Sequence, residues 1–351
     1  MSGGAAAPLR HQNRPLTALR GLAALWVVGL HMQFGLAYLG YAYAGSVFRP
    51  GYMAVDIFFV LSGFVITAVH RDLNPAGLGA FFRRRIFRIY PLHLFVLGLI
   101  LALWLWGFWM NGAPDPTQRL RDLPIVALLL QPYLLHGLTW NTASWSIGIE
   151  MLCYLLFPLA LALLRPRPLG GTILLLIALA LFERHVHSEM IWGWPAILRG
   201  IAGFGLGMLL QQASLLLPRP SARTADLFAI LAVAALLLTL AGGAPANVPL
   251  CAALLIFALA AERGRVWCLL GAAPLVWLGE ISFSLYLLHP TVLGLAYVWF
   301  PPARLGLPPG ETALLWAALV TALLLGLATL SWAFIETPAR RLGRRLTPAT
   351  V

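Results

Sequence analysis

Ten apolar runs follow one another along the sequence, separated by arginine, proline and glycine. A helix needs about 20 apolar residues to cross the hydrocarbon core of a bilayer, and most of these runs reach that length. Only 10% of the residues are charged, whereas a soluble domain carries about 25%. The sequence therefore predicts an all-α integral membrane protein with about ten transmembrane helices, at residues 16–38, 51–70, 81–110, 144–164, 169–183, 194–214, 224–242, 246–262, 275–299 and 311–336.

A further apolar segment, residues 123–138, is shorter and contains Pro124, Gln131, Pro132 and His136. Irregular backbone at membrane depth is tolerated only where protein or water covers it. We interpret this segment as re-entrant or interfacial.

All 24 basic residues are arginines, against 12 acidic residues. A chain this apolar has no solvated face for a nucleic-acid duplex, so we expect no nucleic-acid partner and take the positive charge as a marker of the cytoplasmic side. With ten crossings and both termini cytoplasmic, 18 arginines lie inside and six lie outside or near the outer face, namely Arg49, Arg119, Arg121, Arg184, Arg199 and Arg304. We expect a cytoplasmic tail (1–15), one transmembrane domain (16–336) and a basic cytoplasmic tail (337–351) in the inner (plasma) membrane.

Ionisable residues inside the spans are costly in lipid and usually functional. Arg20 and His31 are eleven residues apart, so they share a helix face with an axial separation of about 16 Å. Asp56 and Glu150 reach the depth of His31, which predicts a polar pocket in which a carboxylate orients the imidazole as a general base. The alternatives are a snorkelling arginine, a packing histidine and carboxylates paired with arginines.

The third span opens with a basic turn that contains Arg84, Arg85 and Arg88 and is followed by Tyr90. Guanidinium groups bind phosphate through two parallel hydrogen bonds, so an anionic cofactor could bind here. The alternative is a topology anchor that meets anionic lipid.

The ninth span is unusually polar, since it holds Glu280, Ser282, Ser284, Tyr286 and His289. These residues predict either the wall of a wet cavity or helix-to-helix hydrogen bonds. The three cysteines, Cys153, Cys251 and Cys268, are scattered and predict neither a disulfide framework nor a metal site.

Several blocks resemble the acyltransferase-3 family of membrane O-acyltransferases. Leu19-Arg20-Gly21 with His31 is similar to the first-span signature of that family, and the other similar blocks follow in order at 51–64, 82–91, 144–158, 281–289 and 336–340. Ala54, Leu61 and Glu280 depart from the family pattern.

The resemblance implies an enzyme that moves an acyl group, usually acetyl from acetyl-CoA, onto a hydroxyl of a surface glycan or its lipid-linked precursor. It implies that Arg20 and His31 are the essential pair and that Arg85 and Arg88 face CoA. Asp56 and Glu150 join them as candidate catalytic residues, and Arg84 and Tyr90 as candidate cofactor-binding residues. The candidate substrate-binding residues are Ser144, Tyr154, Tyr286 and His289.

Three questions stay open at this stage. His31 acts as a base or is itself acylated. The chain could instead be a transporter or flippase of an anionic or lipid-linked sugar, although we find no pseudo-symmetric halves. It could also be an acyltransferase that tailors a small-molecule metabolite, and the sequence does not identify the acceptor.

Overall fold

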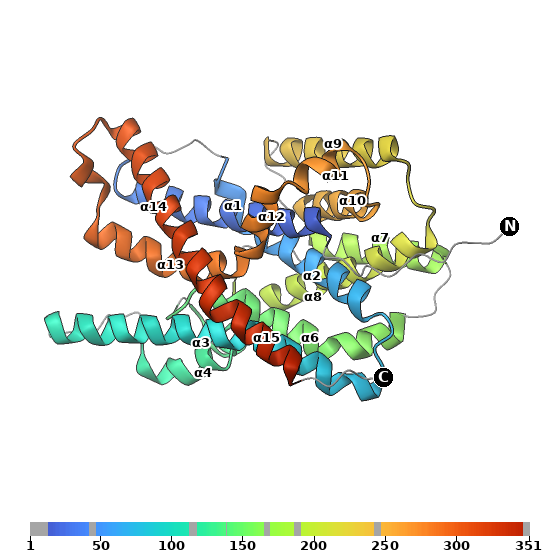
Figure 1. Ribbon diagram of the computed structural model, residues 1–351, viewed down its shortest axis with the longest axis horizontal. Helices are drawn as coiled ribbons and strands as arrows, with labels where there is room; N and C mark the ends of the chain where they lie inside the picture. Colours follow the sequence, from blue (N-terminus) through green and yellow to red (C-terminus); the bar gives the residue numbers. More distant parts are fainter. Residues whose placement is uncertain are drawn as a thin grey trace.

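The computed structural model describes residues 13–41, 47–111, 118–137, 139–164, 169–185, 191–241 and 247–346. Within these ranges the secondary structure is helical, as predicted (Figure 1). The longer helices are α1 (Arg14–Tyr38), α2 (Ala54–His70), α3 (Leu78–Asn111), α6 (Ser144–Leu164), α7 (Leu169–His185), α8 (Gly193–Leu216), α9 (Ala222–Ala241), α10 (Val248–Ala260), α13 (Ser282–Trp299) and α14 (Pro309–Ser331). The shorter ones are α4 (Leu123–Ala127), α5 (Gln131–Leu134), α11 (Arg265–Leu270), α12 (Ala273–Glu280) and α15 (Thr337–Arg345).

The number of helices long enough to cross a bilayer differs from the ten predicted runs. Among the described residues, seven helices are long and apolar enough, and an eighth is added if the bent pair α12 and α13 counts as one span. The helix α10 has 13 residues and is about 20 Å long at 1.5 Å per residue, which is shorter than a ~30 Å bilayer core. In its described residues every predicted run is mainly helical, and the chain is a multi-pass membrane protein, while ten crossings remain a prediction.

The ninth predicted span, 275–299, is not one straight helix. It is bent by 63° between α12 and α13. At the bend the Ser282 hydroxyl donates to the Gly279 carbonyl at 2.7 Å, and such a side-chain bond competes with the regular helical ladder. Beyond the bend, Tyr286 and His289 of α13 lie beside Ser146 and His31 of the first half of the chain.

Close helix contacts through glycine hold α2 against α8. A Cβ atom at Gly63 would lie 1.9 Å from the Phe204 carbonyl oxygen, and one at Gly207 would lie 2.0 Å from that of Val60. Small residues let membrane helices approach in this way. The contact fixes α2, which forms a wall of the site described below.

A second close contact joins α1 to α12. A Cβ atom at Gly279 would lie 1.9 Å from the Thr17 carbonyl oxygen, and one at Gly21 would lie 2.6 Å from the Gly279 amide nitrogen. At the start of α1 the Asn13 side chain accepts from the Leu16 amide as an N-cap and donates to the Leu259 carbonyl of α10. The helix that carries Arg20 and His31 is thus held at its first turn and along its length.

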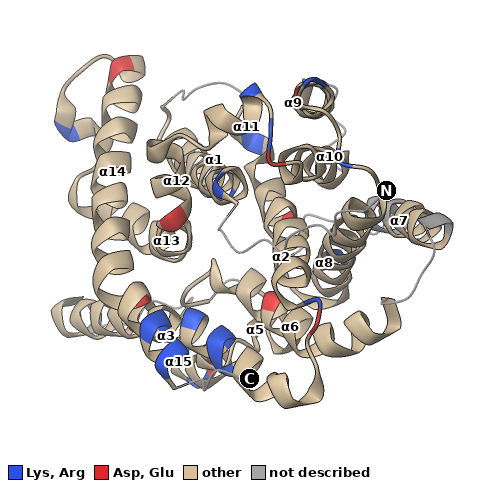
Figure 2. Cartoon of the chain, turned by 45° about the vertical axis from the view of Figure 1, so that its right-hand side comes forward, with Lys and Arg blue, Asp and Glu red and all other residues tan. Residues whose placement is uncertain are grey.

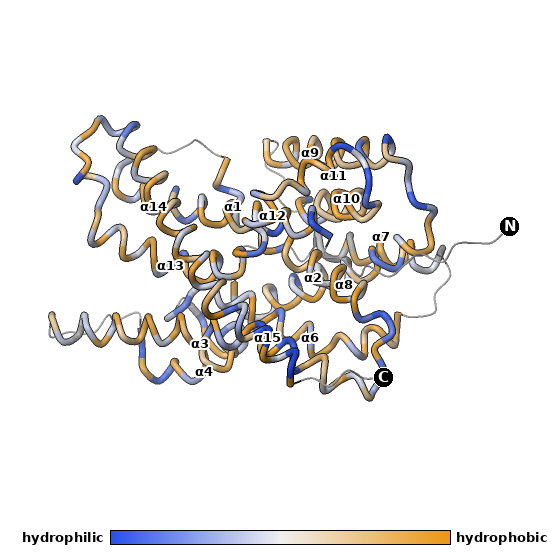
Figure 3. The backbone as a smooth tube through the Cα atoms, viewed as in Figure 1, coloured by the Kyte–Doolittle hydropathy of each residue, from blue (hydrophilic) through white to orange (hydrophobic). Residues whose placement is uncertain are grey.

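The basic residues of α3 and α15 lie together. Figure 2 shows arginines on neighbouring parts of these two helices, and Figure 3 shows hydrophilic residues along α15 while most of the long helices are hydrophobic. The two helices are in contact, because a Cβ atom at Gly343 of α15 would lie 2.5 Å from that of Phe87 in α3. The turn that carries Arg84 to Arg88 therefore belongs to a larger basic region.

Candidate active site

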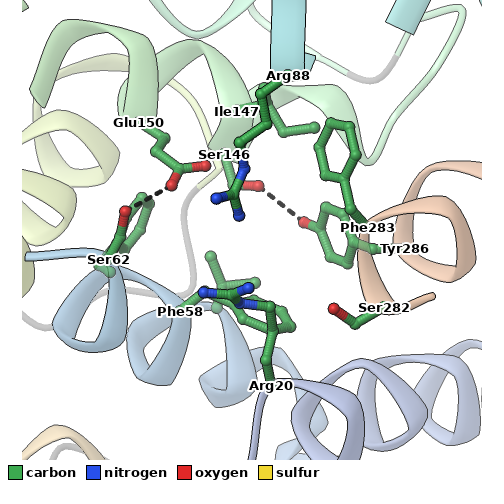
Figure 4. Close-up of a pocket in the computed structure, with 12 residues that line it drawn as sticks. Arg20, Phe58, Ser62, Arg88, Ser146, Ile147, Glu150, Ser282, Phe283 and Tyr286 are labelled. Carbon is green, nitrogen blue, oxygen red and sulfur yellow. Dashed lines mark hydrogen bonds between the residues drawn. The ribbon is translucent and has the colours of Figure 1, made fainter. Parts of the chain in front are cut away.

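The first cavity of the site, which we call the arginine pocket, has a volume of about 60 Å³. Arg20 of α1 and Arg88 of α3 point into it from opposite sides, and Glu150 of α6 forms part of its wall (Figure 4). Its remaining lining residues come from α2, α6 and α13 and are Val55, Phe58, Phe59, Ser62, Ser146, Ile147, Ser282, Phe283 and Tyr286. Two guanidinium groups beside one carboxylate suit the binding of an anion.

Glu150 is held by hydroxyl groups from two helices. Ser62 of α2 donates to its carboxylate at 2.6 Å, and Tyr154, one turn further along α6, donates to the same oxygen. Ser62 and Tyr154 lie 3.2 Å apart, so the three groups form one network. These bonds hold the carboxylate in the wall of the arginine pocket.

The predicted cofactor residues of α3 separate in the structure. Arg88 lines the arginine pocket, while Arg85 lies over the ring of Tyr154 with its guanidinium carbon 5.6 Å from the ring centre. Arg84 is exposed, and the Tyr90 hydroxyl donates to the Leu128 carbonyl at 3.5 Å. Of these residues, only Arg88 belongs to the lining of the cavity.

The second cavity, which we call the histidine cavity, is larger, about 310 Å³. His31 of α1 is exposed to it, and His289 of α13 lies in its wall with a ring-centre distance of 4.8 Å to His31. Its remaining lining residues are mainly apolar and are Val27, Leu30, Phe34, Tyr52, Val55, Thr142, Ala143, Trp145, Ile191, Arg199 and Tyr286.

Backbone carbonyls fix the protonation pattern of the two imidazoles. Nδ1 of His31 lies 2.9 Å from the Val27 carbonyl oxygen, and Nδ1 of His289 lies 2.6 Å from that of Tyr286. A carbonyl only accepts, so Nδ1 carries the hydrogen in each neutral ring and Nε2 keeps its lone pair. His31 therefore has the tautomer that a general base for a hydroxyl needs.

The structure divides the three residues that we expected to share one pocket. His31 lines the histidine cavity, Glu150 lines the arginine pocket, and Asp56 forms a two-pronged ion pair with Arg199 at 2.5 and 2.6 Å. Asp56 and Arg199 are each only 1% exposed. The imidazole is thus oriented by the Val27 carbonyl, and Asp56 serves as the counter-ion of a buried arginine.

Arg199, which we expected outside or near the outer face, is buried within the helix bundle. It lies in α8 with its guanidinium over the ring of Trp145, and it also donates to the Tyr52 carbonyl at 3.1 Å. The sequence signal was present, since Arg199 lies inside the apolar run 194–214. Its partner, 143 residues earlier, was not visible in the sequence.

The four candidate substrate-binding residues also separate. Tyr286 and His289 line the histidine cavity, whereas Tyr154 is buried beside Glu150. Ser144 is fully buried at the start of α6, where it donates to the Asn141 carbonyl at 2.7 Å and accepts from Gln131. In this structure Ser144 and Tyr154 support the fold around the cavities and line neither of them.

Three hydroxyl side chains of the arginine pocket were not among the candidate catalytic, cofactor-binding or substrate-binding residues, although the sequence predicted Ser282 in the wall of a wet cavity. Ser62 bonds Glu150, Ser146 lies 2.9 Å from the Tyr286 hydroxyl, and Ser282 lies at the bend before α13. All three fall inside the family-like sequence blocks, which was the available signal.

The two cavities share part of their lining, because Val55 and Tyr286 belong to both. Helices α1, α6 and α13 contribute residues to both cavities. Along the chain, α1 passes from Arg20 in the arginine pocket to His31 in the histidine cavity, and α13 passes in the same order from Ser282 to His289. The helix α6 runs the opposite way, from Trp145 in the histidine cavity to Glu150 in the arginine pocket. The cavities therefore adjoin each other along the helix axes.

In the described part of the chain, no group of three His, Cys, Asp or Glu side chains could hold a metal ion. The chemistry that the described residues offer is anion binding by guanidinium groups and proton transfer by a neutral imidazole.

Comparison with known proteins identifies the family to which the chain belongs. A family model described as an acyltransferase domain (Acyl_transf_3) matches residues 14–335. The chain is similar to "Acyltransferase MdmB" of Streptomyces mycarofaciens, with 30% identity over 95% of this chain and 94% of that protein. It is similar to "Exopolysaccharide production protein ExoZ" of Rhizobium meliloti, with 28% identity over 86% and 93%. It is also similar to "O-acetyltransferase OatA" of Staphylococcus aureus, with 25% identity over 94% of this chain and 58% of that protein. No solved structure matches the chain.

Proposed function

Because the chain belongs to the acyltransferase-3 family and is a membrane-embedded O-acyltransferase, we propose that it transfers an acetyl group from acetyl-CoA to a sugar hydroxyl. The acceptor is a surface or exported glycan, or its lipid-linked precursor. Similarity to the exopolysaccharide production protein and the O-acetyltransferase supports this acceptor class. The membrane is the inner (plasma) membrane, with the donor on the cytoplasmic side.

The observation that carries the proposal is the junction of two chemically different cavities. Arg20 and Arg88 supply positive charge for the phosphates of the donor, and His31 supplies a neutral base in the adjoining cavity. Val55 and Tyr286 are common to both. An acyl donor bound by its phosphates in the first cavity can present its thioester to a hydroxyl in the second.

The reaction needs one proton transfer and one acyl transfer. Nε2 of His31 takes the proton of the acceptor hydroxyl while the oxygen attacks the thioester carbonyl carbon. The bond from that carbon to sulfur then breaks, and the proton passes from His31 to the leaving thiolate. The products are the O-acetyl sugar and free CoA. Acylation of His31 itself is the alternative route.

The test measures transfer of radiolabelled acetyl from acetyl-CoA to octyl β-D-glucopyranoside by the purified protein in lipid nanodiscs. His31→Ala should lower kcat about 10²- to 10⁴-fold, the usual contribution of a general base. The matched control is His136→Ala, because His136 is exposed and lines neither cavity.

Transfer at the wild-type rate by His31→Ala would contradict the proposed role of His31. A labelled protein that survives denaturation and is lost in His31→Ala would favour the acyl-histidine route over the general-base route. Wild-type protein that transfers acetyl to no sugar would contradict the proposed acceptor class.

A further inference from the structure

Tyr286 stands between the two cavities. Its side chain lines the arginine pocket and the histidine cavity and is only 6% exposed. On α13, Ser282 precedes it in the arginine pocket and His289 follows it in the histidine cavity. Val55 and Tyr286 belong to the lining of both cavities, and we call this shared lining the neck.

Two contacts hold the Tyr286 ring in place. Its hydroxyl lies 2.9 Å from that of Ser146 on α6, and Figure 4 shows this bond across the pocket. Phe58 of α2 packs against the ring edge to face, with ring centres 5.7 Å apart. The ring is therefore fixed from two neighbouring helices, α2 and α6.

The two cavities differ in volume. The histidine cavity, at about 310 Å³, is far larger than the arginine pocket, at about 60 Å³. A small acyl group does not exhaust the space around His31. On the route that the proposed function gives the donor, the acyl group meets the neck before it enters the larger cavity.

From this arrangement, and resting on the proposed function, we infer that Tyr286 determines which acyl groups the enzyme transfers. The donor is bound by its phosphates at Arg20 and Arg88, and the acyl group is the leading end of the arm that reaches His31. The acyl group must pass the Tyr286 ring before it reacts. Acetyl passes the neck, and straight-chain acyl groups with two more methylenes are excluded by the ring that Ser146 and Phe58 hold.

The chemistry at His31 is the same for every donor. The acceptor oxygen forms a bond to the thioester carbonyl carbon, the bond from that carbon to sulfur breaks, and the hydroxyl proton ends on the CoA thiol. Tyr286 takes no part in these steps. Its effect is confined to the choice of acyl group.

The experiment is a competition between acetyl-CoA and butyryl-CoA at equal concentration, with octyl β-D-glucopyranoside as acceptor and nanodisc-embedded enzyme. Mass spectrometry gives the ratio of butyryl to acetyl product. Tyr286→Ala should raise this ratio at least about tenfold, since a methylene that fits or does not fit a pocket changes selectivity by 10- to 200-fold. Tyr286→Phe and Ser146→Ala, which remove the hydroxyl bond and keep the ring, should raise it less.

Phe283→Ala is the matched control. Phe283 is an aromatic residue of the same helix that lines the arginine pocket and not the histidine cavity, so its removal enlarges the path without opening the neck. The ratio in Phe283→Ala should stay within about twofold of the wild-type ratio, well below the 10- to 200-fold effect of a methylene at the neck. An equal rise in Phe283→Ala and Tyr286→Ala would overturn the inference, and so would an unchanged ratio in Tyr286→Ala.

Two further comparisons keep the result unambiguous. Tyr286→Leu keeps an apolar side chain at this buried position, and it replaces Tyr286→Ala if the alanine variant gives no monodisperse protein. Wild-type enzyme that transfers neither acyl group contradicts the proposed function itself. If the wild-type enzyme transfers acetyl and Tyr286→Leu gives the same ratio of butyryl to acetyl product, only the role of the neck is contradicted.

Discussion

The arginine pocket and the histidine cavity adjoin each other but provide opposite electrostatic environments. Charge is concentrated in the small pocket, where Arg20, Arg88 and Glu150 come together. The large cavity is lined mainly by apolar side chains, and its base is a neutral imidazole with its hydrogen on Nδ1. An anionic donor needs the first environment, whereas a base that must take a proton needs to start uncharged.

The histidine cavity also contains an arginine, yet this arginine does not make it a second anion site. Arg199 is bonded by two nitrogen atoms to the two carboxylate oxygens of Asp56. The pair has no net charge, and both side chains are 1% exposed. The difference between the cavities therefore depends on pairing as well as on residue type, and each prediction below changes one side of that difference.

The largest effect is expected from breaking the ion pair. Arg199→Ala leaves Asp56 buried without its main partner, which should lower the free energy of unfolding by about 3–5 kcal/mol. Unfolding by SDS titration in detergent micelles measures this loss. The loss should appear whether or not a donor is bound, because Arg199 does not line the arginine pocket.

The double variant Asp56→Leu with Arg199→Met is the control for this prediction. Replacing both members of a buried pair with apolar residues is often close to neutral, so the double variant should recover most of the stability. If it folds but transfers no acetyl, Asp56 or Arg199, which lines the histidine cavity, has a role in the reaction besides pairing.

The next largest effect is expected in the arginine pocket. Arg88→Ala should weaken donor binding about 10- to 100-fold, since a charge-assisted hydrogen bond contributes roughly 1.5–3 kcal/mol. Isothermal titration with desulfo-CoA, which lacks the thiol but keeps the phosphates, measures the affinity. Arg341→Ala, an exposed residue of α15, should leave it unchanged. An unchanged affinity in Arg88→Ala would remove the assignment of this pocket to the donor.

A smaller effect is expected when α2, which lines both cavities, is displaced. At Gly207 an added Cβ would lie 2.0 Å from the Val60 carbonyl oxygen, so Gly207→Ala must push α8 away from α2. We expect a loss of about 1–3 kcal/mol in the free energy of unfolding, the usual cost of overpacking. Because α2 lines both cavities, donor affinity and transfer rate should fall together.

Gly98→Ala is the matched control, because Gly98 lies inside α3 and a Cβ there would meet nothing within 4 Å. This substitution should be neutral or should stabilise the helix by up to about 1 kcal/mol. If Gly98→Ala lowers the free energy of unfolding as much as Gly207→Ala does, the loss in Gly207→Ala does not come from the close contact between α2 and α8.

The positions of the helices could be predicted because lipid imposes a length and a hydropathy on each crossing. Arg20 and His31 could be placed on one face because the helical repeat is fixed, and the structure places them in neighbouring cavities. Glycines at 63 and 207 mark a close helix contact, but the sequence does not say which helix each one meets.

The partners of the charged residues could not be predicted. Asp56 meets Arg199, and Ser62 meets Glu150, across 143 and 88 residues of sequence respectively. The grouping of His31, Asp56 and Glu150 was based on depth in the membrane, and depth does not give the rotation of a helix about its axis; the structure places His31 and Glu150 in different cavities. The 63° bend before α13 is another local event that an apolar run does not reveal.

The smallest effect is expected from substitution of Arg84. Its dependence on salt should differ from that of the Arg88 substitution. Arg84 is exposed beside the arginine pocket without lining it, so it can attract an anionic donor only through solvent. Arg84→Ala should lower kcat/KM for acetyl-CoA about two- to threefold at low ionic strength, because exposed charge mainly affects the encounter rate.

That loss should vanish near 0.5 M salt, where the screening length falls to roughly 4 Å. The loss in Arg88→Ala should persist at the same salt concentration, because a group inside the pocket contacts the donor directly. Measuring kcat/KM for both variants across a salt series therefore distinguishes attraction by the basic surface from binding in the pocket. A salt-resistant loss in Arg84→Ala would extend the donor site to the surface of α3.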